Sequence, residues 1–368
     1  MPLISVLLPL NFDKPLTYVA DEPLPPGTLV EVPLAKKTVI GCVWDVPPGQ
    51  IDAKKLKHAG RVLSIPPLSK ALRDFVEWVA RWTCASQGQV LKLVLREHEV
   101  LYEPRAQKLV RLKNVPAEKQ SEPRQHVVDL LQDGFARTKA EIAREAGVST
   151  GVIATLLKLG VVEEVLLEPS LPPRLDPQAH LPQLTKAQED VAKIFREHVR
   201  QKKFTTSLLH GATGSGKTEV YFEAVAEAIS QGQQALVLVP EIALTAQFLE
   251  RFTKRFGSAP LEWHSQISPS KRARLWHQII SGEAQVVVGA RSALFLPYKN
   301  IGLIVVDEEH ESSYRQEDYV HYHARDMAVV RGKFENCAVV LSSATPSLES
   351  WANASAGRYE KFDLHERY

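Results

Sequence analysis

The sequence is poor in cysteine and has no long apolar run. Its 368 residues include three cysteines, Cys42, Cys84 and Cys337, which lie far apart and form no C-x-x-C pair. A zinc site or a disulfide framework needs clustered cysteines, so neither is expected within this chain. No stretch approaches the ~20 apolar residues that cross a membrane, and the first residues lack the basic start of a signal peptide. We therefore predict a soluble, cytoplasmic protein without a membrane partner.

The sequence also lacks an excess of charge of either sign. Its 45 lysines and arginines against 43 acidic residues leave a formal net charge of +2. The chain has no global basic field that attracts nucleic acid, so any DNA-binding surface must be local. Hydrophobic residues make up 44% of the chain, which is enough for ordinary globular cores. At ~150 residues per domain, this length predicts two or three domains.

The pattern along the chain predicts an α/β protein with several domains. Residues 1–105 carry short β-branched runs punctuated by Gly and Pro, then a helical stretch, which indicates a small β-rich domain. Residues 115–168 contain three helical stretches and an alternating strand, the pattern of a winged helix. Five prolines indicate a linker at 169–183. From 184 to 368, apolar strands alternate with amphipathic helices, which predicts a doubly wound parallel sheet.

Residues 211–218 read Gly-Ala-Thr-Gly-Ser-Gly-Lys-Thr and fit the phosphate-loop pattern G-x-x-x-x-G-K-S/T at every fixed position. A short apolar strand precedes the loop and a helical stretch follows it, as a bound anion requires. Lys217 is expected to reach the terminal phosphates, and the Thr218 hydroxyl to ligate Mg²⁺. The loop therefore predicts a nucleoside triphosphate site. Its expected contacts are Gly211, Thr213, Gly214, Ser215, Gly216, Lys217 and Thr218.

The segment Asp307-Glu308-Glu309-His310 follows an apolar strand. Ligands of parallel α/β sheets bind at the carboxyl ends of the strands, so Asp307 is expected to hold Mg²⁺ through water. Glu308 is then placed to orient or deprotonate the attacking water. Together with Lys217, these two acids are the predicted catalytic residues, and the Asp-Glu-x-His form is typical of helicase superfamily 2. Upstream, Gln188 is expected to read adenine through its amide; a surface glutamine is the alternative.

Further polar segments follow other strands and are expected to contact DNA, mostly through its phosphates. The stretch 311–325 interleaves tyrosines with arginines and histidines, which suits stacking on single-stranded bases. A loop that packs its own tyrosines is the alternative. Ser342-Ser-Ala-Thr-Pro346 is expected to link the surroundings of Asp307 to a bound strand. The predicted contacts are Thr245, Arg291, Ser292, Tyr314, Arg315, Tyr319, Tyr322, Ser343 and Thr345.

These motifs, in this order, resemble the primosomal protein N-prime (PriA) family of replication-restart helicases. The phrases that carry the resemblance lie at 211–221, 239–245, 289–295, 307–310, 322–326 and 343–346. The resemblance implies a 3′-DNA-end-binding domain, a winged helix and RecA-like helicase lobe 1, in that order. It also implies that Lys57 lies in the 3′-end pocket, in which Thr17 replaces a family aspartate.

The resemblance further implies recognition of stalled or branched forks and 3′-to-5′ unwinding with ATP and Mg²⁺. The implied partners are forked and single-stranded DNA, primosome proteins and single-strand-binding protein. In the family, a second lobe with an arginine finger and a cysteine-rich zinc insertion follow. This chain resembles the N-terminal half, so zinc is expected only in a C-terminal half, and the isolated chain is expected to hydrolyse ATP poorly. The alternative is a non-catalytic protein that binds fork DNA and partners, and that binds ATP without turnover. The helicase-type motif series disfavours a phosphate-loop kinase or GTPase.

Overall fold

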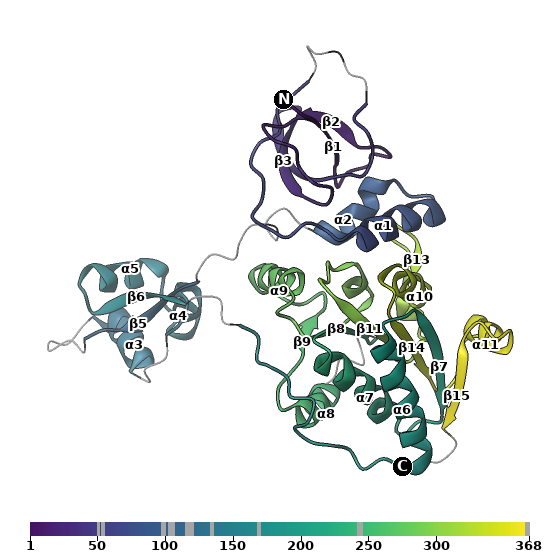
Figure 1. Cartoon of the computed structure of the whole chain (residues 1–368). Helices are drawn as coiled ribbons and strands as arrows, with labels where there is room; N and C mark the ends of the chain where they lie inside the picture. Colours follow the sequence, from purple (N-terminus) through teal and green to yellow (C-terminus); the bar gives the residue numbers. More distant parts are fainter. Residues whose placement is uncertain are drawn as a thin grey trace. The chain divides into compact units, whose positions relative to one another are not determined.

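The computed structural model describes residues 1–49, 52, 56–96, 101, 107–114, 121–132, 136–167, 171–240 and 246–364. The chain divides into two compact units (Figure 1). The larger unit joins Met1–Glu103 to Pro172–Tyr368, and the smaller unit is Pro104–Leu171. No helix in these ranges is long and apolar enough to cross a bilayer.

The larger unit begins with an antiparallel sheet and two helices. The strands are β1 (Leu3–Leu7), β2 (Leu16–Val19), β3 (Leu29–Leu34) and β4 (Lys37–Val43), in the order β2-β1-β4-β3. Helix α1 (Lys70–Thr83) begins where the Ser69 hydroxyl accepts the Leu72 N–H, and α2 (Gln87–Leu95) begins with a Ser86–Gln89 capping box. Both caps satisfy backbone N–H groups that have no partner within the helix, so each helix starts at a defined residue.

A seven-stranded parallel sheet forms the centre of the larger unit, with the order β15-β7-β14-β11-β8-β10-β9. Its strands are almost continuously apolar because helices cover both faces. This confirms the predicted doubly wound parallel sheet and the small β-rich part before it. The strands are β7 (Thr205–Gly211), β8 (Gln234–Leu238), β9 (Leu261–Trp263), β10 (Val286–Gly289), β11 (Ile301–Val306), β14 (Ala338–Ser343) and β15 (Glu360–Leu364).

Side chains alternate between two apolar clusters, one on each face of this sheet. Along β8, Ala235 and Val237 pack with α6, α7 and α8, whereas Leu236 and Leu238 pack on the opposite face with α9 and α10. Helices α1 and α2 join that second cluster, so the N-terminal part and the parallel sheet share one core. The helices are α6 (Lys186–Gln201), α7 (Lys217–Ser230), α8 (Ala246–Phe256), α9 (Pro269–Ser281), α10 (Ala324–Glu335) and α11 (Leu348–Ser355). Short elements near the strand ends are η4 (Arg291–Phe295), η5 (Ser312–Tyr314), β12 (Arg315–Gln316) and β13 (Tyr322–His323).

The proline-rich segment that the sequence indicates as a linker packs on the larger unit over its described part. The Leu175 N–H donates to Gln285 Oε1 (2.8 Å), and the Asp176 N–H donates to the Phe256 carbonyl (3.0 Å). Arg255 Nη1 donates to the Pro177 carbonyl (2.9 Å), and the Leu175 side chain is buried. An apolar side chain and three hydrogen bonds therefore hold this segment against α8 and the start of β10.

The smaller unit contains three helices and one antiparallel strand pair. These are β5 (Gln107–Leu112), α3 (Glu122–Leu131), α4 (Lys139–Glu145), α5 (Thr150–Lys158) and β6 (Val162–Leu167). Its own core includes Val127, Leu131, Ile142 and Leu156. The winged-helix assignment stays a prediction.

Candidate nucleotide and DNA site

The phosphate loop lies between the end of β7 and the start of α7, as its sequence pattern requires. Gly214 and Gly216 have φ values of +82° and +81°, which glycine adopts without strain. A Cβ at Gly216 would also collide with the amide of Gln188. Both glycines are therefore needed for the course of the loop.

Lys217 lies inside this loop and is buried. Its Nζ donates to the carbonyls of Gly211 (2.8 Å) and Ala212 (3.4 Å) and is 4.0 Å from Glu308 Oε1. The Ser215 hydroxyl is buried and has no hydrogen-bond partner among the described residues. A buried cation and a buried donor in a glycine-rich turn fit a phosphate group.

Gln188 is buried against the phosphate loop, so the surface-glutamine alternative is wrong. Its Oε1 accepts the Thr185 N–H (2.8 Å), and its Nε2 donates to the Ser215 carbonyl (3.0 Å). The same side chain thus completes the capping box of α6 and holds the loop. Its expected contact with adenine stays a prediction.

Asp307 is a half-buried acid at the carboxyl end of β11. The Tyr221 hydroxyl donates to Asp307 Oδ2 (3.0 Å), and the Glu308 N–H donates to Oδ1 (3.1 Å). Burial, and then the neighbouring charge of Glu308, raise the pKa of Asp307. Glu308 itself has a φ of +45°, an unfavourable backbone conformation for this residue type. Sequence reasoning missed Tyr221, which stands about one turn after Thr218 on the helix that follows the loop.

Glu309 and His310 connect this turn to neighbouring elements. The fully buried carboxylate of Glu309 accepts hydrogen bonds from the Ser347 N–H (2.7 Å), the Ser350 hydroxyl (2.9 Å) and Arg325 Nη1 (3.3 Å). It therefore anchors the starts of α10 and α11, a role that the sequence did not reveal. His310 Nδ1 lies 2.7 Å from the Ser343 hydroxyl on β14.

The sequence predicts that Ser343 contacts DNA, and the structure shows that this prediction is wrong. Its side chain is fully buried, and its hydroxyl also accepts the Thr345 N–H (3.0 Å). The residue therefore links His310 to the following turn and presents no surface to DNA. Thr345, two residues later, is exposed.

In the tyrosine-rich segment, two more of the predicted DNA contacts are wrong. Tyr314 and Tyr322 are buried, whereas Tyr319 is 88% exposed. The Tyr314 hydroxyl donates to the carbonyls of Leu238 (3.0 Å) and Asp307 (2.6 Å), and the Tyr322 ring lies 5.1 Å from that of Phe295. For these two tyrosines the packing alternative holds, because their rings fill the core and the Tyr314 hydroxyl binds carbonyls at strand ends. Tyr319 and the exposed Arg315 remain available to a strand.

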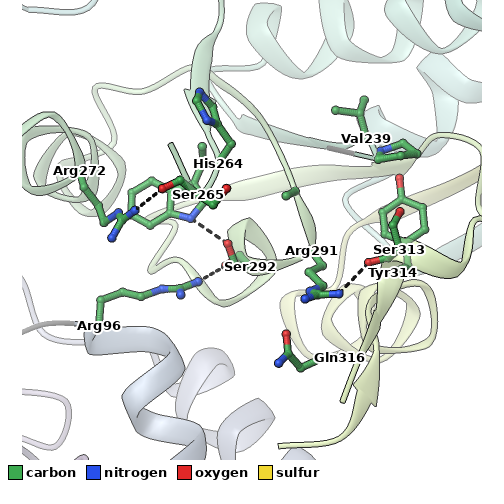
Figure 2. Close-up of a pocket in the computed structure, with 13 residues that line it drawn as sticks. Arg96, Val239, His264, Ser265, Arg272, Arg291, Ser292, Ser313, Tyr314 and Gln316 are labelled. Atoms are coloured by element: carbon green, nitrogen blue, oxygen red, sulfur yellow. Dashed lines mark hydrogen bonds between the residues drawn. The ribbon is translucent and has the colours of Figure 1, made fainter. Parts of the chain in front are cut away.

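Arg291 and Ser292 begin η4 and line a cavity of about 350 Å³ (Figure 2). Arg291 Nη1 donates to the carbonyls of Ser313 (2.9 Å) and Arg315 (2.6 Å), which ties η4 to the tyrosine-rich segment. The Ser292 hydroxyl accepts the Trp263 Nε1–H (3.2 Å). Thr245, another predicted contact, lies outside the described residues.

The residues predicted for the 3′-end pocket lie in the N-terminal part. Lys57 is exposed, and its carbonyl accepts the Val19 N–H (3.0 Å). Thr17 is buried, and its hydroxyl oxygen accepts the Gly49 N–H (2.9 Å). The threonine thus holds the chain near Gly49 in place.

Comparison with known proteins supports this arrangement. Residues 185–354 match the DEAD/DEAH box helicase family, and residues 5–96 match the 3′ DNA-binding domain (3′BD) of PriA. The chain is 36% identical to replication restart protein PriA of Chlamydia pneumoniae. The alignment, gaps included, is 390 residues long and covers 99% of this chain and 51% of that protein. The chain is 33% identical to PriA of Rickettsia conorii, with 100% and 46% covered. PriA of Bacillus subtilis is 41% identical over 64% of this chain and 30% of its own length.

The chain therefore spans about half the length, or less, of the curated relatives that it matches. The resemblance inferred from the motifs is confirmed, because the helicase match covers all the motif phrases and the 3′ DNA-binding match covers most of the β-rich N-terminal part. The chain is a PriA-like protein with a 3′ DNA-binding domain and a DEAD/DEAH box helicase domain.

Proposed function

We propose that this chain is the fork-binding and ATP-binding part of an ATP-dependent 3′-to-5′ DNA helicase of replication restart. The observation that carries the proposal is the meeting of Lys217, Asp307 and Glu308 at the strand ends. Lys217 Nζ lies 4.0 Å from Glu308, and Asp307 precedes Glu308 directly. A buried cation beside two acids is the arrangement that binds and cleaves a nucleotide phosphate with a metal ion.

Each residue of this group has a separate task. Lys217 exchanges its loop carbonyls for the terminal phosphates of ATP, and the N–H groups from Gly214 to Thr218 hold the remaining oxygens. Thr218 and Asp307 would hold Mg²⁺, which would supply positive charge beside the phosphates. Glu308 orients the attacking water. The raised pKa of Asp307 fits this role, since a carboxylate whose charged form is disfavoured gains most from a nearby cation.

The same turn leads to the residues that we assign to DNA. Tyr314 joins Asp307 to the segment that carries Arg315 and Tyr319, and Arg291 bonds to that segment. Thr245 and Thr345 complete the proposed strand contacts of lobe 1, and Lys57 is the proposed contact of the 3′ DNA-binding part. Primosome proteins and single-strand-binding protein are the proposed protein partners. By the same resemblance, the transition-state arginine belongs to a second lobe, so the 368-residue chain alone should turn over ATP slowly.

Nucleotide binding is tested by replacing Lys217 with alanine. At a hundredfold excess over its Kd, ATP–Mg²⁺ should stabilise the wild-type chain by about 2.7 kcal/mol, which is a rise of several degrees in melting temperature. K217A should lose this rise, because the phosphates lose their cation, and should still bind single-stranded DNA. Differential scanning fluorimetry and fluorescence anisotropy provide the two readouts.

The results also separate the alternative functions. Equal ATP stabilisation of wild type and K217A would contradict the assigned site. ATP binding without any DNA-stimulated hydrolysis, even in a longer relative with both lobes, would favour the non-catalytic fork-binding alternative.

A further inference from the structure

The cavity beside Arg291 lies at the carboxyl ends of three strands, β8, β9 and β10. Three arginines line it, Arg96, Arg272 and Arg291, and no acidic residue appears among the described residues of its wall (Figure 2). The wall also contains His264, Ser292 and Gln316. Three guanidinium groups around one hollow of about 350 Å³ make it strongly attractive to anions.

Among the described residues, the hydrogen-bond partners of two of these arginines are all backbone carbonyl groups. Arg272 Nη2 donates to the carbonyls of Ser265 (3.2 Å) and Ile267 (3.5 Å), and Arg291 Nη1 donates to those of Ser313 and Arg315. Neither arginine forms an ion pair with a carboxylate in the described parts of the chain. Carbonyls orient a guanidinium without neutralising it, so both charges and several N–H donors remain for a ligand.

Arg96 reaches the cavity from the N-terminal part. Its Nη2 donates to the Ser292 carbonyl (2.9 Å), and its guanidinium lies 5.8 Å from the centre of the Trp263 ring. Helix α2 ends one residue earlier, and the Trp276 Nε1–H donates to the Val94 carbonyl in that helix (3.0 Å). Shared packing therefore fixes Arg96 relative to Arg272 and Arg291.

We propose that Arg96, Arg272 and Arg291 form a composite site for the backbone phosphates of a single DNA strand. The proposal rests on the proposed function. It adds that Arg96, from the 3′ DNA-binding part, contacts the DNA strand that is bound by the helicase part. The ligand is a phosphate rather than a base because the phenol and indole rings of the wall, Tyr314 and Trp263, are both buried and offer no stacking face. Planar guanidinium groups bind phosphate oxygens in pairs, and such contacts are independent of sequence.

A strand in this site touches both parts of the larger unit. The rings of Phe75 on α1 and Phe295 on η4 lie 5.5 Å apart in a shared apolar core, so the two parts pack directly against each other at this point. The distance along the strand from the 3′-end-binding part to lobe 1 is then set by the fold. This gives the helicase part a fixed register relative to a captured DNA end.

The test uses the full 368-residue chain and a fluorescent single-stranded oligonucleotide at several salt concentrations. R272A should weaken binding about tenfold, as expected when a charge-assisted hydrogen bond is removed. The slope of log K against log salt should become shallower by about 0.7 for each phosphate that R272A leaves without its arginine. R96Q should behave in the same way, and R272K should recover part of the affinity. R358A removes an exposed arginine elsewhere in the helicase part. It is the matched control, because it changes the net charge of the chain as R272A does, and it should bind like wild type.

The melting temperature and the ATP affinity of each variant are measured as well, so that a folding defect in R96Q is recognised. If R96Q does not fold, the result for R272A decides whether the inference holds. Wild-type affinity and salt slope in a folded R272A would overturn this inference and leave the proposed function standing. Failure of the wild-type chain to bind the oligonucleotide would instead contradict the proposed function. Loss of inorganic phosphate binding in R272A with full DNA affinity would assign the site to a free anion and also overturn the inference.

Discussion

Asp307 illustrates how a residue with a proposed functional role can weaken the fold that contains it. Its half-buried carboxylate is partly shielded from water and lies beside the charge of Glu308, and both effects favour the protonated form and raise its pKa. An acid whose pKa is higher in the folded than in the unfolded chain stabilises the fold only at low pH. That contribution is lost as pH rises through the folded pKa, so at neutral pH the charged Asp307 opposes folding. Under the proposed function, this cost would be offset when Asp307 holds Mg²⁺.

Replacement of Asp307 by asparagine should therefore raise the melting temperature of the ligand-free chain at neutral pH. The gain should shrink toward acid pH, where Asp307 is protonated, and the added effect of Mg²⁺ on ATP binding should be lost. Asp363 is a matched control, because its hydrogen bonds with His210 and Lys361 outweigh burial and lower its pKa. D363N should therefore lower the melting temperature at neutral pH. A pH series of thermal melts in which D307N is destabilised at every pH would contradict this account.

The sequence predicts residues well where local chemistry alone determines their place. The phosphate loop needs glycines at Gly214 and Gly216 because of positive φ, so the pattern and the geometry agree. Gln188 and Glu309 differ, since their roles depend on partners 27 and 38 residues away, Ser215 and Ser347. No local pattern reveals such a partner.

The segment between β11 and α10 shows where composition misleads. Tyrosines interleaved with cations suit a DNA-stacking loop, yet Tyr314 and Tyr322 pack inward. The phenol ring is a large apolar group with one polar tip, and the strand ends offer carbonyls to that tip. Only the fold determines which tyrosines meet such carbonyls, so the sequence could not separate Tyr314 from Tyr319.

Single substitutions should separate these tyrosines by their effects. Tyr314→Ala should cost about 3–5 kcal/mol of stability, because a large buried ring and its hydrogen bonds are removed. Tyr319→Ala should leave stability within about 0.5 kcal/mol of wild type, since the ring is exposed, and should weaken single-strand binding by roughly 1–3 kcal/mol at most. Denaturant unfolding and fluorescence anisotropy measure the two effects. Tyr314→Phe serves as the control, since it removes the hydroxyl and keeps the ring. Unchanged DNA affinity in folded Tyr319→Ala would remove this residue from the proposed strand contacts.

The larger unit as a whole joins parts that the sequence separates. Apolar periodicity predicts the parallel sheet and the β-rich N-terminal part as independent domains. It cannot predict that α1 and α2 complete the layer on one face of the sheet, where Trp276 and Arg331 meet them. Long-range packing of this kind depends on the surfaces of two finished substructures. The consequence is that the proposed DNA contacts in the N-terminal part and in the helicase domain belong to one compact unit.

Nucleotide and strand sites within one body should influence each other. The hydrogen bonds of Tyr314 and Arg291 connect Asp307 to the segment of Arg315 and Tyr319, and His310 connects the same turn through Ser343 to Thr345. Binding free energies are reciprocal, so DNA that favours one arrangement of this network must change the affinity for ATP by the same factor that ATP changes the affinity for DNA.

The most direct measurement is therefore the Kd of the chain for ATP–Mg²⁺ with and without saturating single-stranded DNA. We predict that DNA tightens ATP binding by about fivefold or more, the range typical of coupled sites. K217A should lose ATP binding in both conditions and keep its affinity for DNA. An ATP affinity that is identical with and without bound DNA would contradict the account, because it would show two sites that share a chain but no function.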